Sequence, residues 1–353
     1  MPEDRPTVSA GAVLTALREP RLFLGAGLSV LLFLAVGYWP ILGFFTGFLA
    51  PAPLIYYYYR RGRTFGLTMV GLAVLAVALV YAFRDRPAGG LPFLEYCLLA
   101  VVMAEGLRAR FSPGLVVGAS ALSVFLLGLA LVAGSGLIRG EGAWSGARDL
   151  VEGQVRYSLA MFAGLAGEDR PEVEESGREP VPETGEDGQA VRDRAAGEAA
   201  FDLDSLIRTL VDIFPAMVLM GAVFLAWANL LLIRALIART GGPPPAGYLK
   251  TWQAPERLVW VLIAVGFATY FFSGRPRVWA VNLLLILGLV YFFQGLSVVA
   301  FWLDKKSAPP FLRTLIYLVI ALQQYLAVIV AALGLFDLWL DFRKLKTAGE
   351  PEV

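Results

Sequence analysis

Residues Gly334 to Leu345 read GLFDLWLDFRKL, and this stretch decides the class of fold. It closes an apolar segment that begins at Leu315, and it places Asp337, Trp339 and Arg343 where that segment ends. Charged and aromatic side chains at the end of an apolar helix are typical of a helix that leaves a bilayer. The segment therefore predicts a membrane-spanning helix with anchors at the membrane surface.

The composition of the whole chain agrees with that interpretation. Of its 353 residues, 58% are hydrophobic and 17% are charged, whereas soluble domains are nearer about 45–50% and about 25%. Continuous apolar runs recur along the chain, and roughly 20 helical residues cross the hydrocarbon core of a bilayer. The runs do not alternate with a period of two, as barrel strands do. The sequence predicts an all-α, polytopic transmembrane helix bundle.

Several kinds of chemistry are disfavoured by residue types that the chain lacks. It has no histidine and one cysteine, Cys97, which excludes His/Cys zinc sites, histidine triads and disulfides within the chain. It has no GxxxxGK[ST], HExxH or GxSxG motif. A formal net charge of +1 gives no general attraction to nucleic acid. We therefore predict no enzymatic activity, no bound metal or cofactor, and no nucleic-acid partner.

Nine apolar segments are candidate spans, and residues 22–138 and 206–345 form the two parts of the predicted bundle. Pro51 and Pro53 lack amide N–H groups, so they predict a kink or an unwound turn in the second span. The nine segments are Leu22–Tyr38, Ile41–Tyr58, Thr64–Phe83, Leu91–Leu107, Gly114–Ile138, Pro215–Ile233, Leu258–Ser273, Val278–Leu303 and Leu315–Leu345.

Residues 139–205 interrupt the bundle. Trp144 to Leu165 predicts an amphipathic helix along the membrane surface. Glu168 to Glu198 holds eleven acidic and four basic residues, three prolines and no aromatic residue. Such a segment cannot bury enough apolar area to offset its ordering entropy, so it predicts a disordered acidic insertion. Residues 1–21 and 346–353 predict a polar N-terminal arm and a tail.

Lysine and arginine are distributed unevenly among the loops. They gather in Arg60–Arg63, Arg108–Arg110, Arg234–Arg257 and Lys305–Arg313, and the positive-inside rule places these loops and the N-terminus in the cytoplasm. Nine spans would put the basic C-terminal end outside, against the same rule. Either one segment is not a true crossing or the tail is an exception, so we predict eight or nine spans.

Polar side chains inside the predicted spans are the candidate functional residues. A charge near the bilayer centre costs from about 2.5 to more than about 10 kcal/mol, so such groups are functional candidates by default. Glu105, Asn229, Asn282 and Gln294 are the candidate substrate-binding residues if they face one cavity. The alternative for the amides is that they hydrogen-bond between helices and hold the bundle together. For Glu105, the alternative is an ion pair with Arg108, three residues later.

The last span carries two further acidic residues. Asp337 and Asp341 are four residues apart, which places them on one face of a helix. They predict either a structural clamp to a neighbouring loop or a proton-linked site.

A set of short motifs adds a resemblance to these observations. Together they resemble the YybS-like family of polytopic bacterial membrane proteins, which share a domain of unknown function. The motifs are Pro51 with Pro53, Pro215 with Asn229, WQAPERLVW from Trp252 to Trp260, Asn282 with QGLSVVAFW from Gln294 to Trp302, and GLFDLWLDFRKL with Gly334, Asp337, Trp339, Asp341 and Arg343.

That family is also distantly similar to the substrate-binding components of energy-coupling-factor transporters. The resemblance implies a multi-pass protein of the bacterial cytoplasmic (inner) membrane. It also implies a small vitamin or metal bound within the bundle, with separate ATPase and coupling subunits as partners beside the lipid bilayer.

Two functions follow as hypotheses. The first is a protein that binds or transports a small solute in the manner of a transporter's substrate-binding component. The alternative is a non-transporting membrane scaffold, or an assembly or regulatory factor, that contacts other membrane proteins through the acidic insertion and the C-terminal end.

Overall fold

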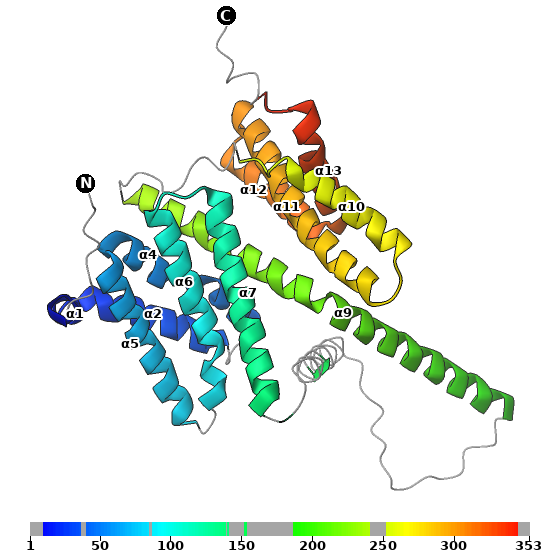
Figure 1. Ribbon diagram of the computed structural model, residues 1–353, viewed down its shortest axis with the longest axis horizontal. Helices are drawn as coiled ribbons and strands as arrows, with labels where there is room; N and C mark the ends of the chain where they lie inside the picture. Colours follow the sequence, from blue (N-terminus) through cyan, green and yellow to red (C-terminus); the bar gives the residue numbers. More distant parts are fainter. Residues whose placement is uncertain are drawn as a thin grey trace, which may run out of the picture. The chain divides into compact units, whose positions relative to one another are not determined.

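The computed structural model describes residues 10–36, 40–84, 87–138, 140, 152–153, 186–240 and 252–344, and all its regular elements in these ranges are helical (Figure 1). The chain divides into two compact units, one of Met1–Gly128 with Ala216–Val353 and the other of Leu129–Pro215. The predictions for the amphipathic helix Trp144–Leu165 (apart from residues 152–153), for residues 168–185 and for the tail lie outside the described residues.

The first four helices come from the predicted N-terminal arm and the first two predicted spans. α1 (Ala10–Leu17) occupies part of the arm and meets α2 (Pro20–Val36) at 76°. The predicted second span is two ten-residue helices, α3 (Pro40–Leu49) and α4 (Ala52–Arg61), with Pro51 at the N-cap of α4. Proline interrupts helical hydrogen bonding but suits the start of a helix, so the helix is broken where Pro51 and Pro53 predict a distortion.

The next helices follow the predicted spans more closely, until the insertion. Gly62, at φ 98°, joins α4 directly to α5 (Arg63–Ala82). A 3₁₀ turn, η1 (Pro87–Gly90), precedes α6 (Pro92–Arg108) and α7 (Pro113–Ile138). α9 (Glu186–Arg239) then runs for 54 residues. Its start differs from the predicted disorder, because residues 186–198 are helical and rich in strong helix formers such as alanine, glutamate and arginine.

Four helices complete the chain: α10 (Arg257–Phe271), α11 (Arg275–Lys305), α12 (Pro310–Leu322) and α13 (Gln324–Leu340). α12 and α13 meet at 106° on either side of Gln323, which has an extended backbone. The predicted ninth span is therefore two helices and not one straight crossing.

Within the described ranges, four helices are long and apolar enough to cross a membrane. They are α5, Pro113–Gly134 of α7, Arg208–Arg239 of α9, and α11, and the number rises to six if α1 with α2 and α12 with α13 each form one span. The predicted eight or nine spans are therefore not reproduced. α6 and α10, at 17 and 15 residues, are shorter than the roughly 20 residues that cross a bilayer unaided.

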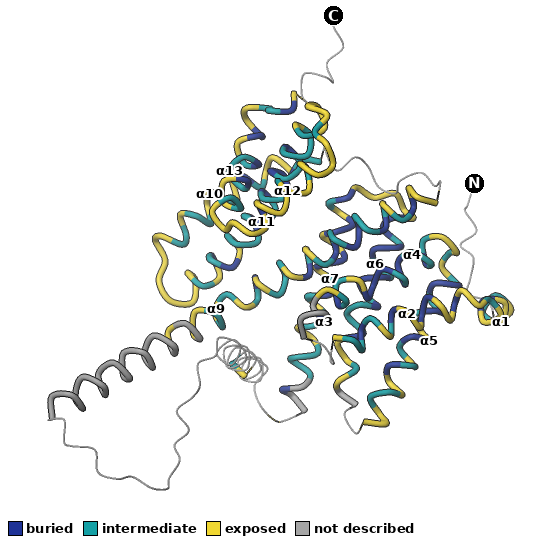
Figure 2. Tube along the Cα trace, turned by 180° about the vertical axis from the view of Figure 1, so that it is seen from behind, coloured by how far each residue is buried: buried dark blue, intermediate teal, exposed yellow. Residues whose placement is uncertain are grey.

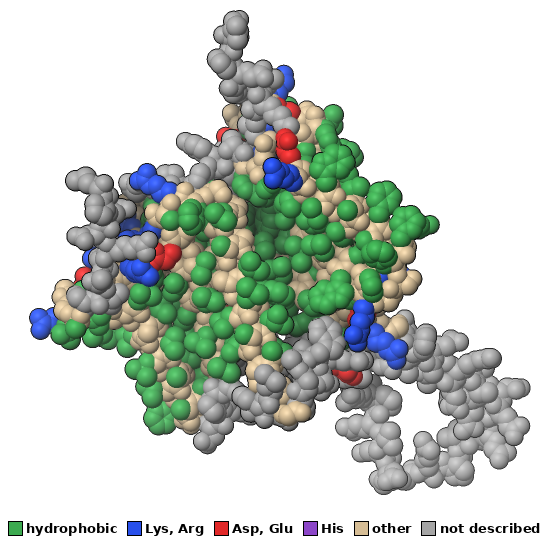
Figure 3. Space-filling view, in the orientation of Figure 1, with side chains coloured by type: hydrophobic (Ala, Val, Ile, Leu, Met, Phe, Trp, Pro, Cys, Tyr) green, Lys and Arg blue, Asp and Glu red, His purple; other side chains and the backbone are tan. Residues whose placement is uncertain are grey.

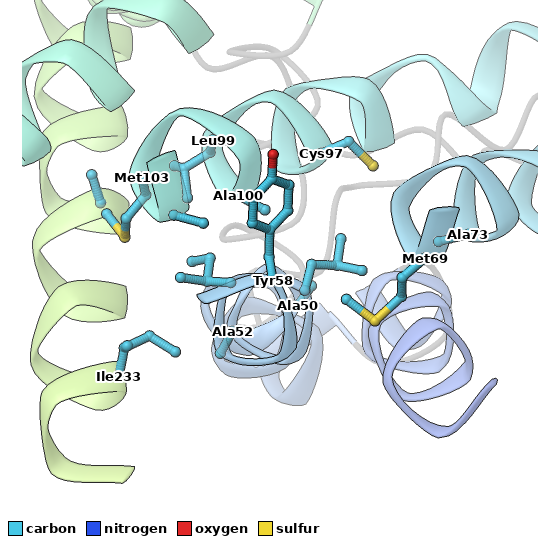
Figure 4. Packing of buried hydrophobic residues seen from close by; sticks show 14 of the residues in the cluster. Ala50, Ala52, Tyr58, Met69, Ala73, Cys97, Leu99, Ala100, Met103 and Ile233 are labelled. Atoms are coloured by element: carbon cyan, nitrogen blue, oxygen red, sulfur yellow. The ribbon is translucent and has the colours of Figure 1, made fainter. Parts of the chain in front are cut away.

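The larger hydrophobic core lies among α2, α4, α5, α6, α7 and α9. Figure 2 shows buried residues concentrated on α4 and α6, whereas α10 and α12 are largely exposed. In Figure 4, Tyr58 projects from α4 toward Ala100 of α6, and Ile233 of α9 borders the same cluster. The short helix α4, which begins at the break after α3, is thus enclosed by protein. At membrane depth, irregular backbone is tolerated where protein surrounds it.

The surface carries the pattern expected of a protein surrounded by lipid. Hydrophobic side chains cover most of the face shown in Figure 3, and charged side chains gather at its margins. Exposed large side chains include Leu75 and Leu79 of α5 and Leu122, Leu126 and Leu129 of α7. In water such a surface would be an aggregation hazard, so its natural surroundings are the hydrocarbon of a bilayer.

Candidate functional site

The C-terminal end of α13 carries a fully buried ion pair. Arg343 Nη2 lies 2.6 Å from Asp337 Oδ2, and Arg343 Nε lies 3.1 Å from the same oxygen. Neither side chain is exposed to solvent. Asp341 ends the helix with left-handed backbone angles, φ 41° and ψ 54°, which aspartate adopts more readily than most residues. This turn brings Arg343 back against Asp337.

The same ion pair fixes the segment that precedes α10. Arg343 Nη1 donates a hydrogen bond of 3.1 Å to the carbonyl oxygen of Trp252. Gln294 of α11 accepts one of 3.1 Å from the amide N–H of Ala254 and donates one of 3.4 Å to Asp337 Oδ2. We name Gln294, Asp337 and Arg343 the clamp. It joins three stretches that the sequence analysis singled out separately, WQAPERLVW, QGLSVVAFW and GLFDLWLDFRKL.

Two glycines let the clamp form. A Cβ atom on Gly295 would overlap the carbonyl oxygen of Val330, and one on Gly334 would overlap the carbonyl oxygen of Tyr291. α11 and α13 therefore touch backbone to backbone, an approach that small residues permit in membrane helices. The close crossing brings Asp337, three residues after Gly334, within reach of Gln294. Trp339 points elsewhere: it is exposed, with its ring centroid 6.2 Å from that of Phe336.

The clamp is also relevant to the question of which side of the membrane the C-terminal end occupies. Because Arg343 bonds to Trp252, the end of α13 lies beside the start of α10. Arg257, at that start, belongs to the loops that the charge count assigns to the cytoplasm. The 106° bend between α12 and α13 lets the chain return to that side. A helix pair bent in this way is either one broken span or a re-entrant loop, and both of the alternatives for the ninth segment stay open.

The side chains of Asn229 and Ser29 donate hydrogen bonds to backbone carbonyl groups at the break between α3 and α4. Asn229 Nδ2 donates 2.9 Å hydrogen bonds to the carbonyl oxygens of Phe48 and Leu225, and Ser29 Oγ donates one of 2.5 Å to that of Ala50. In a continuous helix the carbonyls of residues 48 and 50 would accept from residues 52 and 54. Side chains of α9 and α2 therefore bond two carbonyl groups at the break between the helices.

Asn282 of α11 likewise bonds a backbone group of α9. Its Oδ1 accepts a 2.9 Å hydrogen bond from the amide N–H of Ala216, and its Nδ2 donates one of 2.9 Å to the carbonyl oxygen of Val278. Ala216 directly follows Pro215, which lies inside the helix. Gln294 likewise bonds Ala254, just before Pro255. Asn282 and Gln294 thus each bond a backbone N–H next to a proline, and Asn229 bonds the carbonyl of Phe48, three residues before Pro51. These bonds fit the structural alternative that the sequence left open.

This role predicts a particular result for Asn282→Leu. Leucine keeps the size of the side chain and removes the acceptor for Ala216, so we expect the free energy of unfolding to fall by about 1–2 kcal/mol. Affinity for any bound solute should not change. Equilibrium denaturation in detergent, beside a ligand titration, measures both quantities. A large loss of solute affinity at unchanged stability would contradict the structural role.

Glu105 lies in the last turn of α6, where its side chain is partly exposed. The Tyr58 hydroxyl donates a 2.6 Å hydrogen bond to Glu105 Oε1, and Arg63 Nε lies 3.4 Å from the same oxygen. The structure pairs Glu105 with Arg63 on α5 and not with Arg108. Both side chains of this ion pair are more than 40% exposed, so the bond is worth little by itself. It joins the ends of α4, α5 and α6.

A cavity of about 470 Å³ lies between α7, α9, α11 and α12. Its wall is mainly apolar; Trp252, Ser297 and Tyr317 carry polar groups, and so does Trp227 in its indole N–H. Ser297 Oγ is already bonded to the carbonyl oxygen of Phe293. The remaining lining residues are Pro113, Gly114, Val117, Gly118, Val223, Leu231, Val290, Phe293, Leu296 and Ala300.

Trp252 connects the clamp with the cavity. Its carbonyl oxygen is bonded to Arg343, while its indole ring lies so close to Gly114 of α7 that a Cβ there would overlap Trp252 Nε1. The clamp therefore holds one wall of the cavity in place. Trp252 belongs to a motif visible in the sequence, but no sequence signal showed that its ring faces α7.

The four predicted substrate-binding residues do not share this cavity. Glu105, Asn229, Asn282 and Gln294 are all described by the structure, and none of them is among its lining residues. Gln294 is linked to the cavity indirectly, because it bonds Ala254, two residues after the lining residue Trp252. The residues that do line the cavity are aromatic and aliphatic side chains whose helical spacing also fits an ordinary core.

The apolar helices, their lipid-compatible surface and the buried polar ties between them define a polytopic α-helical membrane protein. Residues 27–338 match the family described as "Predicted membrane protein (DUF2232)", and the chain belongs to that family. Comparison with curated proteins and with solved structures finds no match.

Proposed function

We propose that this protein binds a small, mainly apolar solute in the cavity between α7, α9, α11 and α12. The observation that carries the proposal is the cavity itself: about 470 Å³, lined by aromatic and aliphatic side chains with a few polar groups. Sites for small molecules have this character and range from about 300 to 1,000 Å³. Indole and phenol rings favour a solute with an aromatic or other flat apolar part.

The role that follows is that of a substrate-binding component of a transporter in the bacterial inner membrane. The distant similarity of the YybS-like family to the substrate-binding components of energy-coupling-factor transporters, mainly in the first six predicted spans, supports this role. The sequence has no nucleotide-binding motif, so separate ATPase and coupling subunits would supply the energy. The proposal assigns no catalytic step to the chain.

The test uses two glycines that stand in open space. Gly118 lines the cavity, and nothing lies within 4 Å of a Cβ added there. Gly118→Leu should fill the cavity without disturbing the helices and should abolish ligand binding. Gly221→Leu, at an equally open glycine of α9 outside the cavity lining, is the matched control and should bind as the wild type does.

The measurement is a thermal-shift screen of the detergent-purified protein against vitamins and cofactor precursors with apolar rings. A hit should raise the Tm of the wild type and of Gly221→Leu but not that of Gly118→Leu. Quenching of tryptophan fluorescence should follow the same order, since Trp227 and Trp252 line the cavity. Absence of any hit, or equal shifts in the two variants, would overturn the proposal.

A membrane scaffold is the second candidate, and one observation favours it. Residues 186–207 extend α9 beyond its apolar part, Arg208–Arg239, by about 33 Å at 1.5 Å per residue. A polar helix of this length offers a surface for a partner protein. Affinity purification with and without residues 168–198 tests this role, and identical sets of co-purified proteins would contradict it.

A further inference from the structure

A second cavity, of about 480 Å³, lies at the ends of α2 and α4. It is lined by Arg21, Tyr56, Tyr57, Arg60 and Arg61. It shares no residue with the apolar cavity, and its character is the opposite, because guanidinium groups and tyrosine rings form its wall. The solute-binding function proposed above does not use it.

Positive charge is in excess in this cavity. Arg61 Nη1 lies 3.2 Å from Glu19 Oε2, while Arg21 and Arg60 have no carboxylate partner among the residues that the structure describes. Three arginines thus meet one carboxylate. A guanidinium group offers a planar fork of N–H donors that matches phosphate oxygens, and it is more weakly hydrated than an ammonium group. The charge and the donors point to a phosphate group as the ligand.

The tyrosine part of the wall is held in place by packing. A Cβ atom on Gly25 of α2 would lie 2.7 Å from Tyr57 Cδ2, so the ring rests directly on that helix. The Tyr57 ring centroid is 5.3 Å from that of Tyr56, edge-on, and 6.5 Å from that of Phe65. The Glu19–Arg61 ion pair ties the start of α2 to the end of α4. The cavity is therefore shaped before any ligand enters.

Exposed apolar side chains that flank Arg21 in the sequence indicate where the phosphate would come from. Leu14 and Leu17 of α1 and Phe23 and Leu24 of α2 are exposed, on either side of Arg21 in the sequence. α1 meets α2 at 76°, so it runs close to the membrane plane if α2 crosses the bilayer. A ligand with both a phosphate and acyl chains satisfies both kinds of surface. We propose that this cavity binds the phosphate head group of an anionic phospholipid.

The test compares one double variant with a matched control. Arg21→Gln with Arg60→Gln removes the two arginines that have no carboxylate partner among the described residues, and it leaves the Glu19–Arg61 pair intact. Arg277→Gln removes an exposed arginine of α11 outside this cavity. The full-length protein, purified in a neutral detergent, is titrated with phosphatidylglycerol, phosphatidylcholine or inorganic phosphate. Thermal shift and native mass spectrometry report the bound lipid.

Phosphatidylglycerol should bind more tightly than phosphatidylcholine or inorganic phosphate, and the preference should shrink at 1 M salt, where the Debye length is about 3 Å. Each arginine near an anionic lipid contributes about 1 kcal/mol, or about fivefold in affinity, so the double variant should bind about 25-fold more weakly. Arg277→Gln should bind as the wild type does. Equal binding of the two lipids, or an unchanged affinity in the double variant, would overturn the proposal. Inorganic phosphate bound as tightly as phosphatidylglycerol would show that the site does not select a lipid.

Discussion

Replacing Arg343 with methionine is expected to lower the free energy of unfolding by about 3–5 kcal/mol. Methionine preserves the length and apolar body of the side chain but removes the cation. Asp337 would then keep a carboxylate with no exposed surface and no positive partner. An uncompensated buried charge is among the most costly single defects in a folded protein. Equilibrium denaturation of the detergent-solubilised protein measures the loss.

The double variant Asp337→Leu with Arg343→Met separates the charge from the packing. With both charges gone, no buried charge is left without its partner, so the double variant should regain most of the lost stability. Arg277→Gln, at an exposed position, should be neutral. If the double variant is as unstable as Arg343→Met alone, the lost hydrogen bond to Trp252, and not the unpaired carboxylate, carries the effect.

Gly295→Ala is the second change with a large expected effect, about 3 kcal/mol or more. The added methyl group would occupy the place of the Val330 carbonyl oxygen. That atom is backbone and cannot rotate aside, so α11 and α13 must separate. Separation would also lengthen the bond between Gln294 and Asp337 and release the segment at Trp252.

A control for this change lies seven residues earlier in the same helix. A Cβ atom on Gly288 meets nothing within 4 Å, so Gly288→Ala should be neutral or stabilise the protein by up to about 1 kcal/mol through helix propensity. Thermal unfolding and tryptophan fluorescence of the two variants report stability and the environment of Trp252. Equal stability of Gly295→Ala and Gly288→Ala would show that the backbone contact is absent.

The class of fold could be predicted from the sequence because it depends on local features. Long apolar runs set the helical membrane class, and Pro51 and Pro53 marked the place where α3 gives way to α4. The bend that divides the predicted ninth span could not be predicted, because no proline or glycine stands at Gln323. The helical start of α9 was missed for a related reason: net charge argued for disorder while alanine and glutamate favoured a helix.

The candidate site was predictable only in part, since it depends on contacts between distant segments. The sequence marked Asn229, Asn282 and Gln294 as polar groups that need partners, and it left open whether a solute or another helix supplies them. Their partners are backbone groups near prolines, up to 181 residues away. The sequence carries no comparable signal for an apolar cavity. Apolar residues such as Trp227 and Phe293 recur at the same helical spacing whether they line a cavity or fill a core.

The hydrogen bond between Asn229 and Phe48 has a consequence for how the chain is made. Ribosomes add about 5–20 residues per second, so the 181 residues between these partners take about 10–35 s to synthesise. Throughout that interval the break between α3 and α4 lacks the side chain that covers its Phe48 carbonyl group. The contact between α9 and the break between α3 and α4 can therefore form only after the chain has been synthesised as far as Asn229.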